Sequence, residues 1–213
     1  MRDIVTPDSA IHDVTALGTR LYASGIGNGS TYIYDTSAIG VSAPPLLGTV
    51  SSGSRSHASW VSSDGTILVS AQERSNGKVQ IFDISTPSSP VLLSTMDRAS
   101  LSIDAYSPHN PVLFNDTLLF VSWYEAGVVA IDISDPSNPQ KVGSYDTFPG
   151  GANFFDGNWG VYPLLGLDRV LLSDRQAGLY VVDATDLPEP SLGLQLAVGL
   201  AFLFGVGRRR TRR

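Results

Sequence analysis

Short runs of apolar residues, in which β-branched and aromatic side chains predominate, recur along the chain up to about residue 187. Their clearest forms are four segments that align with one another: TYIYDTS (31–37), VQIFDIS (79–85), VVAIDIS (128–134) and LYVVDAT (179–185). The aspartates of these segments, Asp35, Asp83, Asp132 and Asp183, are 48, 49 and 51 residues apart. Such runs are typical of β-strands, so the chain is expected to repeat one strand-rich unit of about fifty residues.

Further strands are predicted around each aspartate segment. In the second unit, residues 58–61 and 66–70 flank a Ser-Ser-Asp-Gly turn, and in the third unit residues 111–114 and 117–123 flank Asn-Asp. These turn residues tolerate positive φ, which favours a hairpin. Another short strand follows the first three aspartate segments. Four strands in a unit of about fifty residues are typical of a β-propeller blade.

The sequence therefore predicts an all-β fold, a β-propeller with about four blade-like repeats in residues 1–187. The blades are expected near 11–50, 56–99, 107–148 and 157–187. No helical periodicity appears in this part, which excludes an α-solenoid, and a β-sandwich would not repeat itself in this way. Residues 1–10 make a poor closing strand and the fourth unit lacks a convincing outer strand. We therefore expect these repeats to be part of a larger ring and the chain to be truncated at its N-terminus.

The C-terminal residues 188–213 differ from the repeats. Pro188, Glu189 and Pro190 precede an apolar run over 192–207, and a basic cluster follows: Arg208, Arg209, Arg210, Arg212 and Arg213. As a helix the run reaches roughly 24 Å, slightly less than the hydrocarbon core of a bilayer at about 30 Å. It is expected to insert in a membrane with the arginines on the cytoplasmic side, which places the repeats outside. The alternative is a helix buried against the repeats.

Charge and composition narrow the function classes. Residues 1–207 carry nine basic and twenty acidic side chains, a formal charge of 9 − 20 = −11, which argues against a nucleic-acid partner. The chain has no cysteine, which excludes thiol nucleophiles, thiolate metal sites and disulfides. Residues 1–14 show no export signal, in keeping with the expected truncation.

The three histidines occur at one phase of the repeat. His12, His57 and His109 are 45 and 52 residues apart, and each comes before the first strand of its unit. First strands line the channel of a propeller, so these imidazoles are expected to converge and to bind a divalent metal such as Zn²⁺. Asp13, Asn110 or Asp104 could add an oxygen ligand. The alternative is one structural histidine reused in each blade, whose ring N–H bonds a carbonyl of its neighbour.

Two other candidates have structural alternatives. The four strand-ending aspartates could bind calcium, but an Asx bond that caps the next turn suits them better. The glycine- and aromatic-rich loop at 148–155 is either a binding surface for carbohydrate or protein or a wide crossing between blades. No HExxH, P-loop, dinucleotide or GxSxG motif is present.

Two resemblances to known families carry further expectations. VQIFDIS and VVAIDIS are close variants of LVIVD repeats. Together with segments such as YEAGVVAIDISDPSNPQKVGSYDTFPG (124–150) and GNWGVYPLLGLDRVLLSDRQAGLYVVD (157–183), they resemble the choice-of-anchor B family of surface propellers. The tail from Pro188 is similar to the PEP-CTERM sorting signal of Gram-negative bacteria. This resemblance implies export, membrane anchoring and processing by an exosortase-type enzyme at the cell envelope.

These observations favour a non-enzymatic, exported β-propeller that acts as a binding or scaffold module at the bacterial envelope. Its expected partners are the processing enzyme, the membrane and an envelope protein or polysaccharide. No catalytic residue is assigned. The alternative function is a metal-dependent hydrolase with His12, His57 and His109 at the propeller channel.

Overall fold

The computed structural model describes residues 6–8, 10–40, 42–148, 150 and 155–188. Apart from one short 3₁₀ helix, the regular elements of these residues are β-strands, which confirms the all-β prediction. The strands form four antiparallel sheets, each an up-and-down meander of consecutive strands. The predicted four-bladed β-propeller architecture is therefore confirmed.

The first three blades have four strands each and the fourth has three. The first consists of β1 (Ile11–Leu17), β2 (Arg20–Gly25), β3 (Ser30–Asp35) and β4 (Leu46–Ser51). The second consists of β5 (Ser56–Val61), β6 (Ile67–Gln72), β7 (Val79–Asp83) and β8 (Val91–Met96). The third consists of β9 (Pro111–Phe114), β10 (Leu118–Ser122), β11 (Val128–Asp132) and β12 (Gln140–Tyr145). The fourth consists of β13 (Asn158–Tyr162), the helix η1 (Leu167–Arg169), β14 (Val170–Asp174) and β15 (Gly178–Val182).

The hairpins turn where the sequence predicted. Gly65 has φ 72°, and Asn115 and Asp116 have φ 50° and 58°, so these turns use the positive φ that glycine, asparagine and aspartate tolerate. Each strand-ending aspartate accepts a hydrogen bond from the backbone N–H two residues later; for Asp83 and Ser85 the distance is 2.8 Å. These aspartates thus form Asx turns at the ends of β3, β7, β11 and β15.

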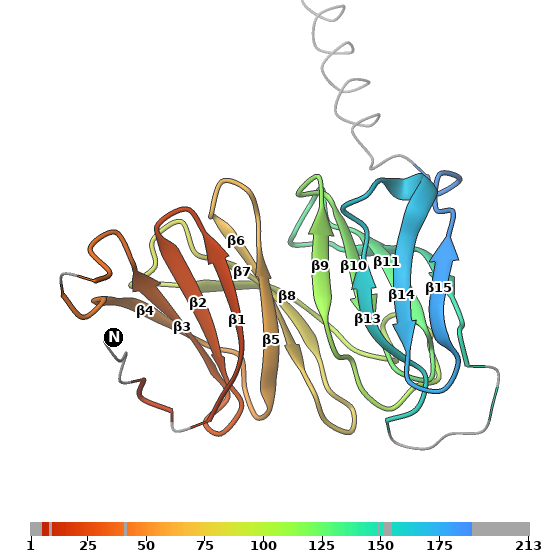
Figure 1. Cartoon of the computed structure of the whole chain (residues 1–213), viewed down its shortest axis with the longest axis horizontal. Coiled ribbons are helices and arrows are strands. Elements are labelled where there is room, and N and C mark those ends of the chain that lie inside the picture. Colours follow the sequence, from red (N-terminus) through yellow and green to blue (C-terminus); the bar gives the residue numbers. More distant parts are fainter. Residues whose placement is uncertain (1–5, 9, 41, 149, 151–154, 189–213) are drawn as a thin grey trace, which may run out of the picture.

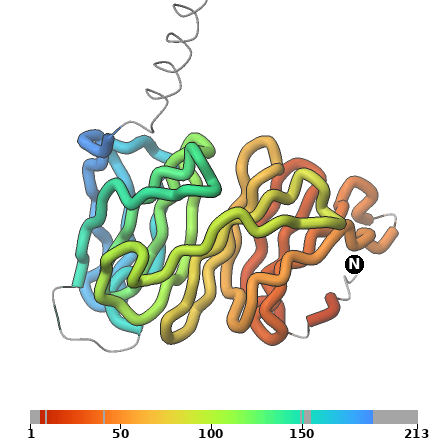
Figure 2. Tube along the Cα trace, turned by 180° about the vertical axis from the view of Figure 1, so that it is seen from behind, coloured from red at the N-terminus to blue at the C-terminus, as the bar shows by residue number. Residues whose placement is uncertain are grey.

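The blades are arranged as an open arc. In Figure 1 they follow one another along the long axis, with the first and fourth blades at opposite ends of the molecule. Figure 2 shows the same order from behind. The first strand of each blade lies beside that of the next, β1 near β5, β5 near β9 and β9 near β13. The predicted larger ring stays a prediction.

Most of the core lies between the blades, and one further cluster, Ala23, Tyr32 and Tyr34, lies within the first blade. Val69 and Ile81 of the second blade pack against Leu119 and Ile131 of the third, and equivalent clusters join the first blade to the second and the third to the fourth. The middle strands are covered on both faces, which explains why β6, β10 and β11 read as nearly continuous apolar runs.

The outer face of the fourth blade continues this pattern without a covering blade among the described residues. Leu179 and Val181 hold the positions that Val128 and Ala130 hold in the third blade, counted back from Asp183 and Asp132. Val128 and Ala130 are buried, whereas Leu179 is 67% and Val181 60% exposed.

The expected C-terminal helix, the rest of the tail beyond Pro188 and most of the loop at 148–155 lie outside the described residues. Within the part of the chain that the structure describes, no helix has the length and apolar character needed to cross a membrane.

Candidate functional site

Two of the histidines project from irregularities within the first strands, whereas His109 lies two residues before β9. His12 and His57 each lie at a shift of register, between Ile11 and Asp13 in β1 and between Ser56 and Ala58 in β5. Trp159 takes the same place in β13. A bulge inserts an unpaired residue and re-aims its side chain, so each bulge directs a ring away from the blade-to-blade core.

The structure brings the three histidines together in one row. The ring centroids of His12 and His57 are 4.1 Å apart, and those of His57 and His109 are also 4.1 Å apart. Trp159 continues the row, with its ring 4.3 Å from that of His109. Four successive blades therefore contribute one ring each to a continuous aromatic ladder.

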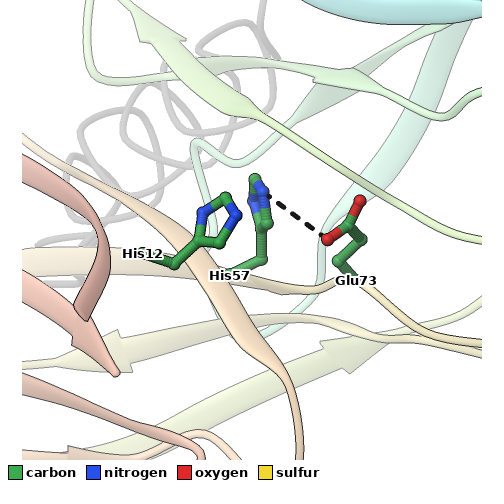
Figure 3. A group of neighbouring side chains, drawn as sticks. All are labelled: His12, His57 and Glu73. Carbon is green, nitrogen blue, oxygen red and sulfur yellow. Dashed lines mark ion pairs between the residues drawn. The ribbon is translucent and has the colours of Figure 1, made fainter. Parts of the chain in front are cut away.

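A carboxylate, Glu73, faces this ladder from the residue after β6. Its Oε2 is 3.7 Å from Nε2 of His57, and its Oε1 is 3.7 Å from Nε2 of His109. The hydroxyl of Tyr124 donates a hydrogen bond of 2.5 Å to Glu73 Oε1. One ligand atom each from His12, His57 and Glu73 lies within 4.8 Å of the other two, an arrangement that could hold a metal ion. Figure 3 shows these three side chains and the His57–Glu73 pair.

Burial keeps the inner imidazoles neutral. His57 and His109 are 2% and 1% exposed. Desolvation, together with the nearby His12, lowers the pKa of His57 to about 3. Desolvation and the neighbouring His57 lower the pKa of His109 to about 4, against the opposing effects of the Trp159 carbonyl and Glu73. At neutral pH both rings have lone pairs that can bind a cation without first losing a proton.

The protonation pattern of His109 follows from its surroundings. Its Nδ1 is 2.6 Å from the carbonyl oxygen of Trp159, and since a carbonyl can only accept, Nδ1 carries the hydrogen. The lone pair is then on Nε2, toward Glu73. Within the described residues, Nε2 of His109 and both ring nitrogens of His57 are buried without a hydrogen-bond partner. Buried polar atoms are rarely left unsatisfied, and a bound ion is one of the partners that such atoms accept.

The oxygen ligand of this group is not one that the sequence suggested. Asp13 accepts a hydrogen bond from the backbone N–H of Val14, and the side-chain amide of Asn110 donates one to the Trp159 carbonyl. Asp104 is exposed. The group that could hold a metal ion includes Glu73 in their place, and His109 lies beside it.

Sequence reasoning missed a second periodic row. The row consists of Glu73, Tyr124 and Arg175, which are 51 residues apart. Each of them lies two residues after a strand residue that pairs with the following strand; these strand residues are Ala71, Ser122 and Ser173. Their common phase was a usable signal, but three different residue types conceal it. Tyr124 also has φ 33°, a region that favours glycine, so its backbone is held in a strained conformation beside the site.

The comparisons with known proteins support the repeat and the fold. The LVIVD repeat matches residues 75–98 and 118–147, which cover parts of the second and third blades. No curated protein is similar to the chain in sequence. Solved structures that are similar include the periplasmic gluconolactonase PpgL of Pseudomonas aeruginosa, with 16% identity and a TM-score of 0.65 over 84% of this chain and 51% of that one.

Two further structures show the range of this fold. A putative 6-phosphogluconolactonase of Bacteroides uniformis has 17% identity and a TM-score of 0.57, over 85% of this chain and 59% of that one. Sqt1 of Saccharomyces cerevisiae has 13% identity and a TM-score of 0.59, over 84% of this chain and 45% of that one. The chain thus spans about half the length of the propellers that it matches, and at these identities the likeness shows the fold alone.

The expectation of a non-enzymatic scaffold is wrong. The finding that contradicts it is that propellers named as lactonases are among the similar structures. The physical reason lies in the site: the scaffold expectation rested on the lack of a local catalytic motif, whereas the chemical groups here come from different blades.

Proposed function

We propose that this chain contributes the active site of a metal-dependent hydrolase that opens lactones or related esters. The observation that carries the proposal is the group of His12, His57 and Glu73, with buried, neutral, unpartnered ring nitrogens on His57. The names of the similar propellers supply the substrate class.

His12, His57 and Glu73 would hold the ion, and imidazole with carboxylate is a donor set that suits Zn²⁺. A bound divalent ion polarises a carbonyl and lowers the pKa of water. The hydroxyl of Tyr124 donates a hydrogen bond to Glu73 Oε1, and the other carboxylate oxygen, Oε2, faces His57. Such partners orient ligands and tune affinity.

His109 is placed to move the proton. In lactone opening, water adds to the carbonyl carbon, the ring C–O bond breaks, and the alcohol oxygen leaves with a proton. The Nε2 lone pair of His109, fixed by the bond from Nδ1 to the Trp159 carbonyl, accepts the proton of the water and returns it to the leaving oxygen.

The test is zinc binding and lactone hydrolysis by the whole chain. We expect one zinc per chain by calorimetry, and hydrolysis of D-glucono-δ-lactone that requires it. Glu73→Gln keeps the shape of the side chain but should weaken zinc binding at least ten-fold. The matched control is Asp104→Asn, an exposed carboxylate that the sequence offered as a ligand. A wild-type chain that folds but binds no divalent metal contradicts the proposal.

We further propose that the protein is exported and held at the cell envelope. The tail from Pro188, its arginine block and its likeness to a sorting signal support this, and one similar propeller is named as periplasmic. Membership of the choice-of-anchor B family belongs to the same proposal. Fractionation of native cells with intact-mass analysis tests it; a product found only in the cytoplasm would overturn export.

A further inference from the structure

The aromatic ladder ends at an arginine. Arg175 follows β14, and its guanidinium carbon is 5.5 Å from the ring centroid of Trp159, a residue that is 42% exposed. The guanidinium also donates to the carbonyl oxygen of Phe155. Arg175 is the blade-four counterpart of Glu73 and Tyr124, so it lies in the row that borders the proposed metal site.

The guanidinium is held in place but has no neutralising ion pair among the described residues. Asp174, the acid next to it in sequence, accepts a hydrogen bond from the hydroxyl of Thr147, and Asp156 accepts one from the side-chain amide of Gln176. At the other end of β14, Arg169 pairs with Asp168 at 3.0 Å. A planar guanidinium that lies over an aromatic ring can still offer its remaining N–H groups to an oxyanion, and a guanidinium can bind an oxyanion with two parallel hydrogen bonds.

The position of Arg175 defines which part of a ligand it reaches. Trp159 lies edge-on to Tyr124, with centroids 6.1 Å apart, and Tyr124 in turn bonds Glu73. Two aromatic rings therefore separate Arg175 from the proposed metal ligand. A ligand group that contacts Arg175 is therefore distant from a ligand group that lies at Glu73.

We propose that the substrate carries a second anionic group, a phosphate or a carboxylate distant from the reacting carbonyl, and that Arg175 binds it while Trp159 packs against the carbon chain or ring between. This inference rests on the proposed function and names the substrate class, an acidic lactone or ester. Because the repeats are strongly acidic, such a substrate requires a specific cationic contact.

The test measures binding of three hydrolysed, open-chain acids to the whole chain by calorimetry, with and without zinc. Gluconate has no distal anion, glucarate has a distal carboxylate, and 6-phosphogluconate has a distal phosphate. We expect one or both of the distal anions to bind roughly ten- to a hundred-fold more tightly than gluconate. The acid with the larger gain in affinity over gluconate shows whether the second anionic group of the substrate is a carboxylate or a phosphate.

Arg175→Gln should remove this preference and leave gluconate binding unchanged. Arg169→Gln, at the opposite end of the same strand, is the matched control and should keep the preference. Arg175→Lys should restore only part of it, because an ammonium lacks the planar fork. Circular dichroism checks that each variant is folded.

The inference is overturned if the two distal anions bind no better than gluconate, if none of the three binds, or if the preference survives in Arg175→Gln. Failure of the proposed function looks different. In that case zinc does not bind to the chain. The preference for a distal anion is also measured on the metal-free chain, so its outcome does not depend on zinc binding.

Discussion

At the scale of single residues, the site depends on what burial does to two imidazoles. His57 and His109 are almost fully buried, and the desolvation that lowers their pKa also makes them ready ligands. The same burial disfavours the protonated imidazole, so the folded protein is expected to lose stability at acidic pH. Sequence could place the histidines at one phase, but it could not show that two of them are buried, because burial depends on the neighbouring blades.

This burial predicts the dependence of stability on pH. The folded-state pKa values, about 3 for His57 and about 4 for His109, lie below the unfolded value of 6.5. Between these limits the unfolded chain binds more protons, so metal-free protein should lose stability as the pH falls from about 6.5 toward 4. The slope is up to about 1.4 kcal/mol per pH unit for each histidine.

Urea unfolding at a series of pH values measures this slope. The double variant His57→Gln with His109→Gln should flatten the curve over the same range. An equally steep curve in that variant would show that other groups are responsible.

Tyr124 gives a second prediction at this scale. Tyr124→Phe removes the hydroxyl that donates to Glu73 and keeps the ring, so zinc affinity should fall roughly ten- to a hundred-fold with the fold intact. Zinc titration by calorimetry measures the change. Tyr106→Phe, a tyrosine in an exposed position, is the control, and equal losses in both variants would exclude a specific role for Tyr124.

At the scale of elements, β-bulges aim rings of the site, and Asx turns follow the third strand of each blade. A bulge in the first strand aims the ring of His12, His57 or Trp159, and the sequence signal was only the recurrence of a residue at one phase. The aspartate turns were predictable, because strand, aspartate and serine or threonine follow one another in each repeat. The local hydrogen bonds of each Asx turn form within a few residues, which is why sequence sufficed.

These turns predict the cost of losing an aspartate. Asp83→Ala removes the acceptor for Ser85 N–H and the hydroxyl of Ser85, and should lower the free energy of unfolding by about 1 kcal/mol. Asp83→Asn keeps an acceptor oxygen and should cost less. Chemical denaturation compares the two. If neither variant differs from the wild type, the turn contributes nothing to stability.

At the scale of the whole molecule, stability comes from contacts between blades. Each sheet buries its faces against its neighbours, so a side chain at one repeat position is buried or exposed according to whether a blade covers it. The outer face of the fourth blade exposes Leu179 and Val181, the positions that are buried in the third blade.

This difference predicts that leucine-to-alanine substitutions at two positions of the fourth blade have different effects on stability. Leu172 is fully buried between the third and fourth blades, and Leu172→Ala should cost about 2–5 kcal/mol of unfolding free energy. Leu179→Ala, at a position that is 67% exposed, should change it by no more than about 0.5 kcal/mol. Urea denaturation of the whole chain measures both. A large loss for Leu179→Ala would mean that this face is covered in solution.

Periodicity along the chain was enough to predict the strands, the repeat, the turns and the common phase of His12, His57 and His109. These are properties of short segments that recur, and each recurrence strengthens the same local pattern. The choice of Glu73 over Asp13, Asn110 and Asp104 required the folded molecule. Glu73, Tyr124 and Arg175 share a phase but no chemistry, and they meet the histidines only because neighbouring blades pack in a fixed register.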